Sequence, residues 1–146
     1  MEENDGIVVH DHLFDPCGYS MNGVANKDRY WTIHITPEAH CSYVSFETNF
    51  APESYDSLVS KVMDTFQPQR ASVVIQADKL SPLVEGSCAA GLKAACVEGY
   101  SVSGQSIAQL VDGFTVQLVN YEGIDSSVDD GSWTMSSQSS MDSDRS

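Results

Sequence analysis

Two neighbouring segments of this chain alternate between apolar and polar residues. In residues 29–36 an apolar side chain occupies every second position, and residues 42–48 repeat the pattern. A period of two is typical of a β-strand, because successive side chains point to opposite faces of the sheet. Pro37 follows the first segment and, since it has no N–H to donate, is expected to interrupt the ladder. The short link predicts an antiparallel hairpin with one apolar face and one more polar face.

Residues 53–66 change to a helical period. Their apolar residues follow the spacing i, i+3, i+4, i+7, i+11, which forms one stripe on an amphipathic helix: Tyr55, Leu58, Val59, Val62 and Phe66. Pro52 suits the first turn of this helix, and Pro68 lies just past its end. The pattern therefore predicts one clear helix after the hairpin.

The remaining segments carry weaker patterns. Residues 71–77 are rich in β-branched side chains and residues 114–121 alternate, so both are predicted to be strands. Between them we expect a short strand over 94–97 and a brief helix over 103–111. Strands that outnumber a single clear helix indicate an α+β fold with a mostly antiparallel sheet covered by helices.

Both ends of the chain are acidic. Residues 122–146 are rich in serine and aspartate, cannot bury enough surface to offset their ordering entropy, and are expected to form a disordered tail. Residues 1–12 are expected to be an acidic lead. The formal net charge of −14 argues against nucleic acid or an anionic membrane as a partner. The sequence shows neither a signal-peptide pattern nor a membrane-spanning run, which favours the cytoplasm.

The cysteines and histidines show no metal-binding pattern. The four cysteines are irregularly spaced without a Cys-x-x-Cys pair, so we expect four thiols, with a disulfide between Cys88 and Cys96 as the alternative. His10 and His12 form a His-x-His pair, but no further ligands converge on it in the sequence. No metal site is therefore expected.

A longer signal runs through the predicted hairpin. Leu-Phe-Asp-Pro-Cys-Gly-Tyr-Ser-Met-Asn begins at residue 13, Tyr-Trp-Thr-Ile-His-Ile-Thr-Pro-Glu at residue 30, and Ser-Tyr-Val-Ser-Phe-Glu-Thr-Asn at residue 42. These segments resemble the S-adenosylmethionine decarboxylases of the eukaryotic type, pyruvoyl enzymes that serve spermidine and spermine biosynthesis. The match is nearly unbroken over residues 13–49 and fades towards residue 121. The resemblance assigns residues 13–121 to the C-terminal part of that domain.

The resemblance implies a fold, a cofactor and partners. The family fold is a four-layer αββα sandwich of two similar halves, of which this chain would supply about the second. The family's pyruvoyl group arises by autocatalytic cleavage at an upstream Glu-Ser-Ser stretch and forms a Schiff base with the substrate amine. Neither that stretch nor the cysteine that protonates the product is in this sequence. The implied partners are S-adenosylmethionine, putrescine, and either the N-terminal half of the decarboxylase or a paralogous subunit.

Two residues map onto the family's self-processing positions. His34 maps onto the histidine that takes a proton as an ester intermediate collapses by β-elimination, which suits a group that titrates near neutral pH. Ser20 maps onto the serine that positions groups around the scissile bond. From the residues alone, the more usual roles are a hydrogen-bonded strand histidine for His34 and a turn serine for Ser20.

Three residues map onto ligand-binding positions. Phe14 corresponds to one of two rings that sandwich the substrate adenine, and Glu38 to the acid that accepts hydrogen bonds from the ribose hydroxyls. Glu47 corresponds to one member of the buried acidic cluster that binds putrescine in some family members, and here it would be a remnant of that site. The alternatives from the residues alone are core packing for Phe14, a solvated turn for Glu38 and a solvent-facing position for Glu47.

Two functions follow from these observations. The first is a pyruvoyl-dependent S-adenosylmethionine decarboxylase, present as a C-terminal fragment that lacks the pyruvoyl-forming serine and is inactive alone. The second is a non-catalytic partner or activator subunit of a complete decarboxylase. The sequence departs from the family at His40 and Cys41, where an acidic residue and an aromatic are usual, and we expect only a local surface change there.

Overall fold

A computed structural model describes residues 6–26, 28–52, 55–78, 81 and 93–124 of the chain. The described part contains seven β-strands, one α-helix and a short 3₁₀ turn. In chain order they are β1 (Val8–Leu13), β2 (Tyr19–Ala25), β3 (Arg29–Glu38), β4 (Cys41–Thr48), α1 (Tyr55–Phe66), β5 (Arg70–Ala77), β6 (Tyr100–Gln109), the 3₁₀ turn η2 (Val111–Gly113) and β7 (Thr115–Gly123).

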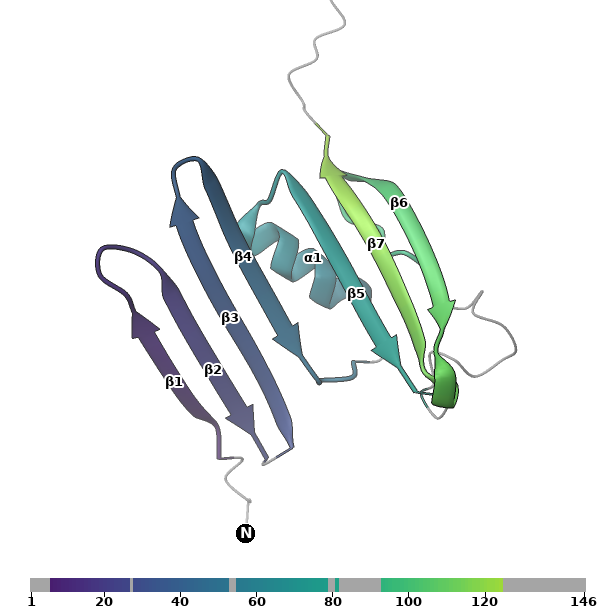
Figure 1. Cartoon of the computed structure of the whole chain (residues 1–146), viewed down its shortest axis with the longest axis horizontal. Coiled ribbons are helices and arrows are strands. Elements are labelled where there is room, and N and C mark those ends of the chain that lie inside the picture. The colour runs from purple at the N-terminus through teal and green to yellow at the C-terminus, as the bar shows by residue number, and fades with distance from the viewer. Residues whose placement is uncertain (1–5, 27, 53–54, 79–80, 82–92, 125–146) are drawn as a thin grey trace, which may run out of the picture.

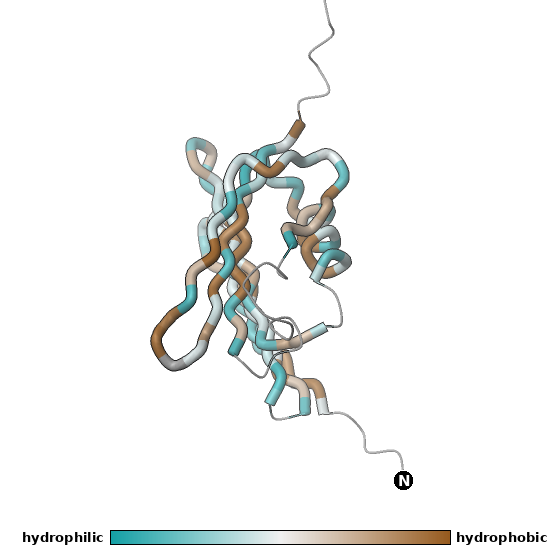
Figure 2. Tube along the Cα trace, turned by 90° about the vertical axis from the view of Figure 1, so that its right-hand side faces the viewer, coloured by the Kyte–Doolittle hydropathy of each residue, from teal (hydrophilic) through white to brown (hydrophobic). Residues whose placement is uncertain are grey.

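The strands form two antiparallel sheets. The first has the order β1-β2-β3-β4 and the second the order β5-β7-β6. The two sheets lie edge to edge in one layer, and α1 lies against one face of that layer (Figures 1 and 2). The expected α+β class with a mostly antiparallel sheet is therefore confirmed for the described residues.

The core lies between α1 and the three-stranded sheet. Val59 and Met63 of the helix are buried there against Val119 and Tyr121 of β7. Leu58, Val62 and Phe66 are half-buried beside them, so the predicted apolar stripe faces this core. Residues 53 and 54, the predicted start of the helix, lie outside the described residues.

Tyr121 connects this core to the segment before β6 through a hydrogen bond. Its side chain is 2% exposed, and its hydroxyl donates a hydrogen bond to the carbonyl oxygen of Ala95 at 3.0 Å. Burial raises the pKa of the Tyr121 hydroxyl above its ordinary value. The folded state therefore favours the neutral phenol.

Removing the Tyr121 hydroxyl is expected to lower the free energy of unfolding by about 0.5–1.5 kcal/mol. Because the folded-state pKa of Tyr121 is raised, its contribution is fully present below the unfolded pKa, near 10, and is lost as the pH rises through the folded value. Urea unfolding of the native chain and of Tyr121→Phe between pH 7 and pH 11 checks this. The free energy of unfolding should fall less with rising pH in Tyr121→Phe than in the native chain. Tyr43→Phe, at a 62% exposed position, should match the native chain.

The four-stranded sheet contains the predicted hairpin. β3 pairs antiparallel with β4, with Trp31 opposite Thr48 and Glu38 opposite Cys41. The prediction that Pro37 interrupts the ladder is wrong, since it lies inside β3 opposite Ser42. β2 pairs with β3 only as far as Ile35, so β3 has a neighbour on one side at the proline. Proline is tolerated at such an edge position because no second strand requires its N–H.

Gly23 of β2 is buried beneath the Trp31 indole on the apolar face of this sheet. A methyl group at Gly23 would overlap the indole ring. Gly23→Ala is therefore expected to lower the free energy of unfolding by about 1–3 kcal/mol, because the indole must move out of its place. Thermal or urea unfolding measures this loss. Gly104→Ala is the matched control: its methyl group would lie 3.5 Å from Asn120 Nδ2, an ordinary contact, and should cost much less.

The second half of the chain differs from the sequence prediction in two places. The helix expected over 103–111 is wrong, since β6 occupies Tyr100–Gln109 and pairs with β7 through a bulge between Val102 and Gly104. The strand expected over 94–97 is also absent. Ala95 and Val97 are buried against the helix and β7 instead, so the apolar residues of that segment pack on the core without joining a sheet.

The ends of the chain also differ. β1 begins at Val8, inside the segment expected to be an acidic lead, and pairs with β2 along its whole length. β7 continues to Gly123, and the expected tail from residue 125 onward lies outside the described residues. The same holds for the alternative disulfide, since Cys88 is not described. The described cysteines are free thiols: Cys17, Cys41 and Cys96.

Candidate functional site

The four-stranded sheet presents a row of polar side chains across its strands. Ser20 of β2 stands opposite His34 of β3, which stands opposite Ser45 of β4. In the adjacent row, Asn22 stands opposite Thr32, and Thr32 opposite Glu47. Directly opposed residues of antiparallel strands point to the same face of a sheet. We call this surface the polar face: Ser20, Asn22, Thr32, His34, Ser45 and Glu47.

Ser20 and His34 are hydrogen-bonded on the polar face. Ser20 Oγ lies 3.0 Å from His34 Nδ1, with the serine half-buried and the imidazole exposed. In the Nε2–H tautomer the serine hydroxyl donates to Nδ1; in the other tautomer Nδ1–H donates to Oγ. In the second case Nε2 has a free lone pair and can accept a proton from a group above the sheet; in the first case Nε2 carries the proton and can only donate it. This pair can hold or move a proton at an exposed surface.

Phe14 lies in the turn that joins β1 to β2. The turn is closed by a hydrogen bond from the Phe14 N–H to the Gly18 carbonyl oxygen at 2.9 Å. Gly18 has φ of 111°, which a residue with a side chain rarely adopts. Phe14 is 49% exposed and lies outside the buried core. The core-packing alternative is therefore not what the structure shows, and much of the ring is open to a ligand.

Glu38 lies at the same end of the sheet as Phe14. The turn after β1 and the hairpin between β3 and β4 both lie at the upper edge in Figure 1. Glu38 is four residues after His34 in β3, so the two side chains point to the same face of the sheet. At roughly 3.3 Å per residue, Glu38 is about 13 Å further along the strand. Its Oε2 lies 3.3 Å from Nε2 of His40, with both side chains at least half exposed. The carboxylate is thus open to solvent, with an imidazole beside it.

Glu47 lies on the polar face one row away from His34. It is exposed and stands opposite Thr32, so the solvent-facing alternative describes its surroundings in this structure. Among the described residues, no group of three or more histidine, cysteine, aspartate or glutamate side chains could hold a metal ion. Glu47 therefore belongs to no such group in the part of the chain that the structure describes.

His12 has no role predicted from the sequence. It stands opposite Ser20 in the pairing of β1 with β2, next to the Ser20–His34 pair. Its ring lies against Phe14, with ring centroids 4.5 Å apart and planes at 77°. The His-x-His spacing could have indicated that both histidines lie on one face of a strand, because residues two apart in a strand point to the same side. Since residues 8–13 were not predicted to form a strand, the spacing suggested only a metal motif.

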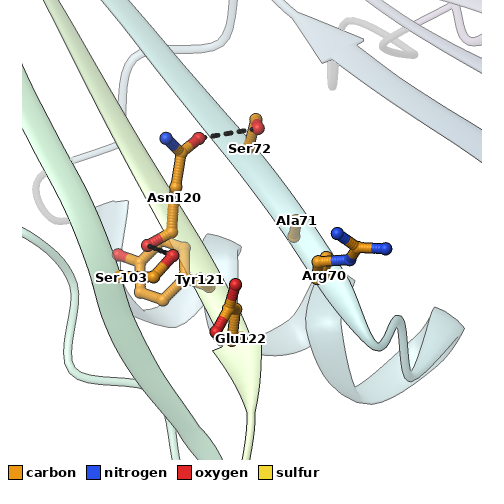
Figure 3. Close-up of a pocket in the computed structure, with 7 residues that line it drawn as sticks. All are labelled: Arg70, Ala71, Ser72, Ser103, Asn120, Tyr121 and Glu122. Atoms are coloured by element: carbon orange, nitrogen blue, oxygen red, sulfur yellow. Dashed lines mark hydrogen bonds between the residues drawn. The ribbon is translucent and has the colours of Figure 1, made fainter.

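A cavity lies elsewhere, on the three-stranded sheet. Its volume is about 190 Å³, and Figure 3 shows the side chains that line it. Ser72 Oγ donates to Asn120 Oδ1 at 2.8 Å, and Ser103 Oγ donates to the Asn120 carbonyl oxygen at 3.4 Å. These polar groups bond to one another within the sheet. The cavity brings together none of the residues assigned to the polar face.

No helix in the described part of the chain combines the length and the apolar character needed to cross a membrane.

Comparison with known proteins identifies relatives of this chain. The family described as adenosylmethionine decarboxylase matches residues 3–122. An S-adenosylmethionine decarboxylase proenzyme of Dictyostelium discoideum is 41% identical over 123 residues, covering 84% of this chain and 31% of the relative. The proenzyme of Drosophila melanogaster is 56% identical over 73 residues, covering 50% of this chain and 21% of the relative.

A solved structure agrees with the fold. The crystal structure of the Trypanosoma brucei AdoMetDC-delta26 monomer matches 81% of this chain and 47% of its own, with 31% identity and a TM-score of 0.69. The chain thus spans less than a third of the length of the two proenzymes and about half of the solved structure. Sequence and fold agree, and the chain belongs to the adenosylmethionine decarboxylase family.

Proposed function

We propose that this chain forms part of a pyruvoyl-dependent S-adenosylmethionine decarboxylase, to which it contributes substrate-binding and self-processing residues. The observation that carries the proposal is the Ser20–His34 hydrogen bond on an exposed polar face, with Phe14 and Glu38 at one end of the same sheet. A surface that only packed against another layer would not need an imidazole bonded to a hydroxyl. Because the chain belongs to the adenosylmethionine decarboxylase family, we assign these groups to the reaction of that family.

Phe14 and Glu38 bind the nucleoside part of the substrate in this proposal. The exposed face of the Phe14 ring stacks on the adenine, which an aromatic ring does through dispersion and desolvation. The Glu38 carboxylate accepts hydrogen bonds from the two ribose hydroxyls, since a carboxylate can accept two donors at once. Their position at one end of the sheet leaves the Ser20–His34 pair on the side towards the methionine part.

Ser20 and His34 act in self-processing. The imidazole of His34 accepts the proton released as the ester formed at the cleavage site collapses by β-elimination, and Ser20 orients the imidazole through its hydrogen bond. When bound, a pyruvoyl group supplies an electrophilic carbonyl for the substrate amine. The exposed Ser20–His34 pair fits a cleavage site that approaches from above the sheet. The serine that becomes this group belongs to the polypeptide that covers the polar face.

The complete protein has the four-layer αββα arrangement in this proposal. Apolar side chains on the same face as His34 support a covering layer: Val24, Tyr30 and Tyr43 are 42%, 42% and 62% exposed. Burying them against a second sheet would be favourable, at about 25 cal/mol per Å² of apolar surface. Glu47 would then face that layer as a remnant of a putrescine site.

Reconstitution tests the proposal. Purified alone, the chain is expected to release no carbon dioxide from carboxyl-labelled S-adenosylmethionine above background. Expressed with the amino-terminal segment of a related proenzyme, which contains the Glu-Ser-Ser stretch, it should support cleavage of that segment and carbon dioxide release. Robust turnover by the chain alone, or an assembled complex that neither cleaves nor turns over, would contradict the proposal.

A second experiment tests the alternative function, an activator subunit. The chain is mixed with a complete, already processed decarboxylase, and the change in turnover is measured. An activator would raise turnover equally well when Ser20 or His34 is replaced by alanine, because neither residue would then take part in chemistry. The Ser20–His34 hydrogen bond favours the catalytic assignment.

A further inference from the structure

We propose that His12 is a positioning residue that holds the Phe14 ring in the orientation that stacks on the substrate base. The inference rests on the proposed function, because that function makes Phe14 a stacking ring. It goes beyond it by giving a role to a histidine on a different element, the edge strand β1. It also gives the half-exposed Phe14 side chain a specific neighbour, the His12 ring.

The pairing of β1 with β2 places His12 correctly for this role. His12 stands opposite Ser20, so its ring lies on the face that carries the Ser20–His34 pair. The ring centroids of His12 and Phe14 are 4.5 Å apart and the planes are 77° from parallel, which is an edge-to-face contact. Such a contact covers one side of the Phe14 ring and leaves the rest of its surface free to stack on the substrate base.

Gly18 lies near the Phe14 side chain. A methyl group placed on Gly18 would lie 3.6 Å from Phe14 Cβ and 3.7 Å from Phe14 Cδ2, so a larger residue at this position would contact the aromatic side chain. The 2.9 Å hydrogen bond from the Phe14 N–H to the Gly18 carbonyl oxygen fixes the backbone of the turn. The turn thus fixes the main chain, and the His12 ring adds a side-chain contact to the Phe14 ring.

A ring that is already oriented binds with less loss of side-chain entropy than one that must be ordered by the ligand. Loss of the His12 contact should therefore weaken binding of an adenine nucleoside by about 2- to 10-fold, the usual range for one aromatic pair. Steps that do not involve the ring, including self-cleavage, should be unaffected. A residue that only stabilised the edge strand would not produce this pattern.

The test measures the Kd of 5′-methylthioadenosine by titration calorimetry in the complex of this chain with the amino-terminal segment. His12→Ala and His12→Gln are each expected to weaken binding about 2- to 10-fold, and His12→Phe should bind as the native complex does, because it restores an aromatic edge. His10→Ala is the matched control. His10 lies on the same strand and face but stands opposite Asn22, and this variant should bind normally.

Phe14→Ala separates failure of this inference from failure of the proposed function. If Phe14→Ala binds normally, the ring has no ligand role, and the inference falls together with the Phe14 assignment in the proposed function. If Phe14→Ala weakens binding and His12→Ala does not, or if His12→Phe fails to restore it, the positioning role of His12 alone is overturned. An equal loss in His10→Ala would also overturn it, since the effect would then belong to the strand.

A second measurement on the chain itself needs no ligand and no complex. With ¹³C-labelled aromatic rings, a nuclear Overhauser effect between the His12 and Phe14 rings is expected, because the centroids are 4.5 Å apart. It should persist in His10→Ala. Absence of the effect in the native chain would remove the contact on which the inference depends.

Discussion

Replacing His34 with alanine is expected to slow self-cleavage of the assembled protein by about 10²- to 10⁴-fold, the usual contribution of a positioned acid–base side chain. The imidazole lies on the open polar face and is oriented by Ser20 Oγ at 3.0 Å from Nδ1. Alanine removes the proton acceptor and leaves the strand pairing intact, because His34 is exposed and its backbone pairs on both sides. Appearance of the two cleavage products on a denaturing gel, followed with time, measures the rate.

Two controls make the His34 result specific. His10→Ala removes an imidazole from the same face, in the adjacent row, and should cleave at the native rate. Ser20→Ala removes the group that orients His34 and is expected to slow cleavage less than His34→Ala does. Cleavage at the native rate in His34→Ala would refute the processing role, and equal slowing in His10→Ala would point to damage to the sheet.

Replacing Glu38 with glutamine is expected to raise KM for S-adenosylmethionine by about 10- to 100-fold, with little change in kcat and none in self-cleavage. A hydrogen bond to a charged acceptor contributes about 1.5–3 kcal/mol, and the amide presents a donor where the second ribose hydroxyl needs an acceptor. Because Glu38 lies far along β3 from His34, its loss should act on binding rather than on proton transfer. Initial rates over a range of substrate concentrations separate kcat from KM.

His40→Ala is the control for Glu38. The Glu38–His40 pair is exposed, and such pairs contribute about 0–1 kcal/mol, so this variant should change KM by less than about fivefold. It leaves the carboxylate in place. A loss in Glu38→Gln that falls on kcat rather than KM would contradict the binding role, and an equal loss in His40→Ala would assign the effect to the Glu38–His40 contact.

Some elements could be predicted because their signal is local. The alternation in residues 29–36 and 42–48 predicts the hairpin and its two faces, and the stripe in residues 53–66 predicts α1 and its buried side. In these segments the pattern reflects burial on one face, which sequence records directly. β6 has no such pattern. Its serine, glycine and glutamine residues form a strand because β7 supplies the ladder, which is a tertiary effect that no local propensity records.

The site residues also divide into positions that could be predicted from the sequence and contacts that depend on strand pairing. The positions of Ser20, His34 and Glu38 could be named from the resemblance, and His34 could be placed on a polar strand face from the alternation alone. The hydrogen bond of His34 to Ser20, fourteen residues earlier in the chain, depends on how β2 is aligned with β3. The contact of His12 with Phe14 depends likewise on β1, a strand that is not predicted from the sequence.

The hairpin, the amphipathic helix, the α+β class and the family can therefore be predicted from the sequence. Which side chains stand together on the polar face depends on how the strands pair. Register between strands is set by the turns that join them and by burial of one whole face, and a shift of one residue would send every side chain to the other face. For that reason Ser20, His34 and His12 become neighbours only once the four strands have paired.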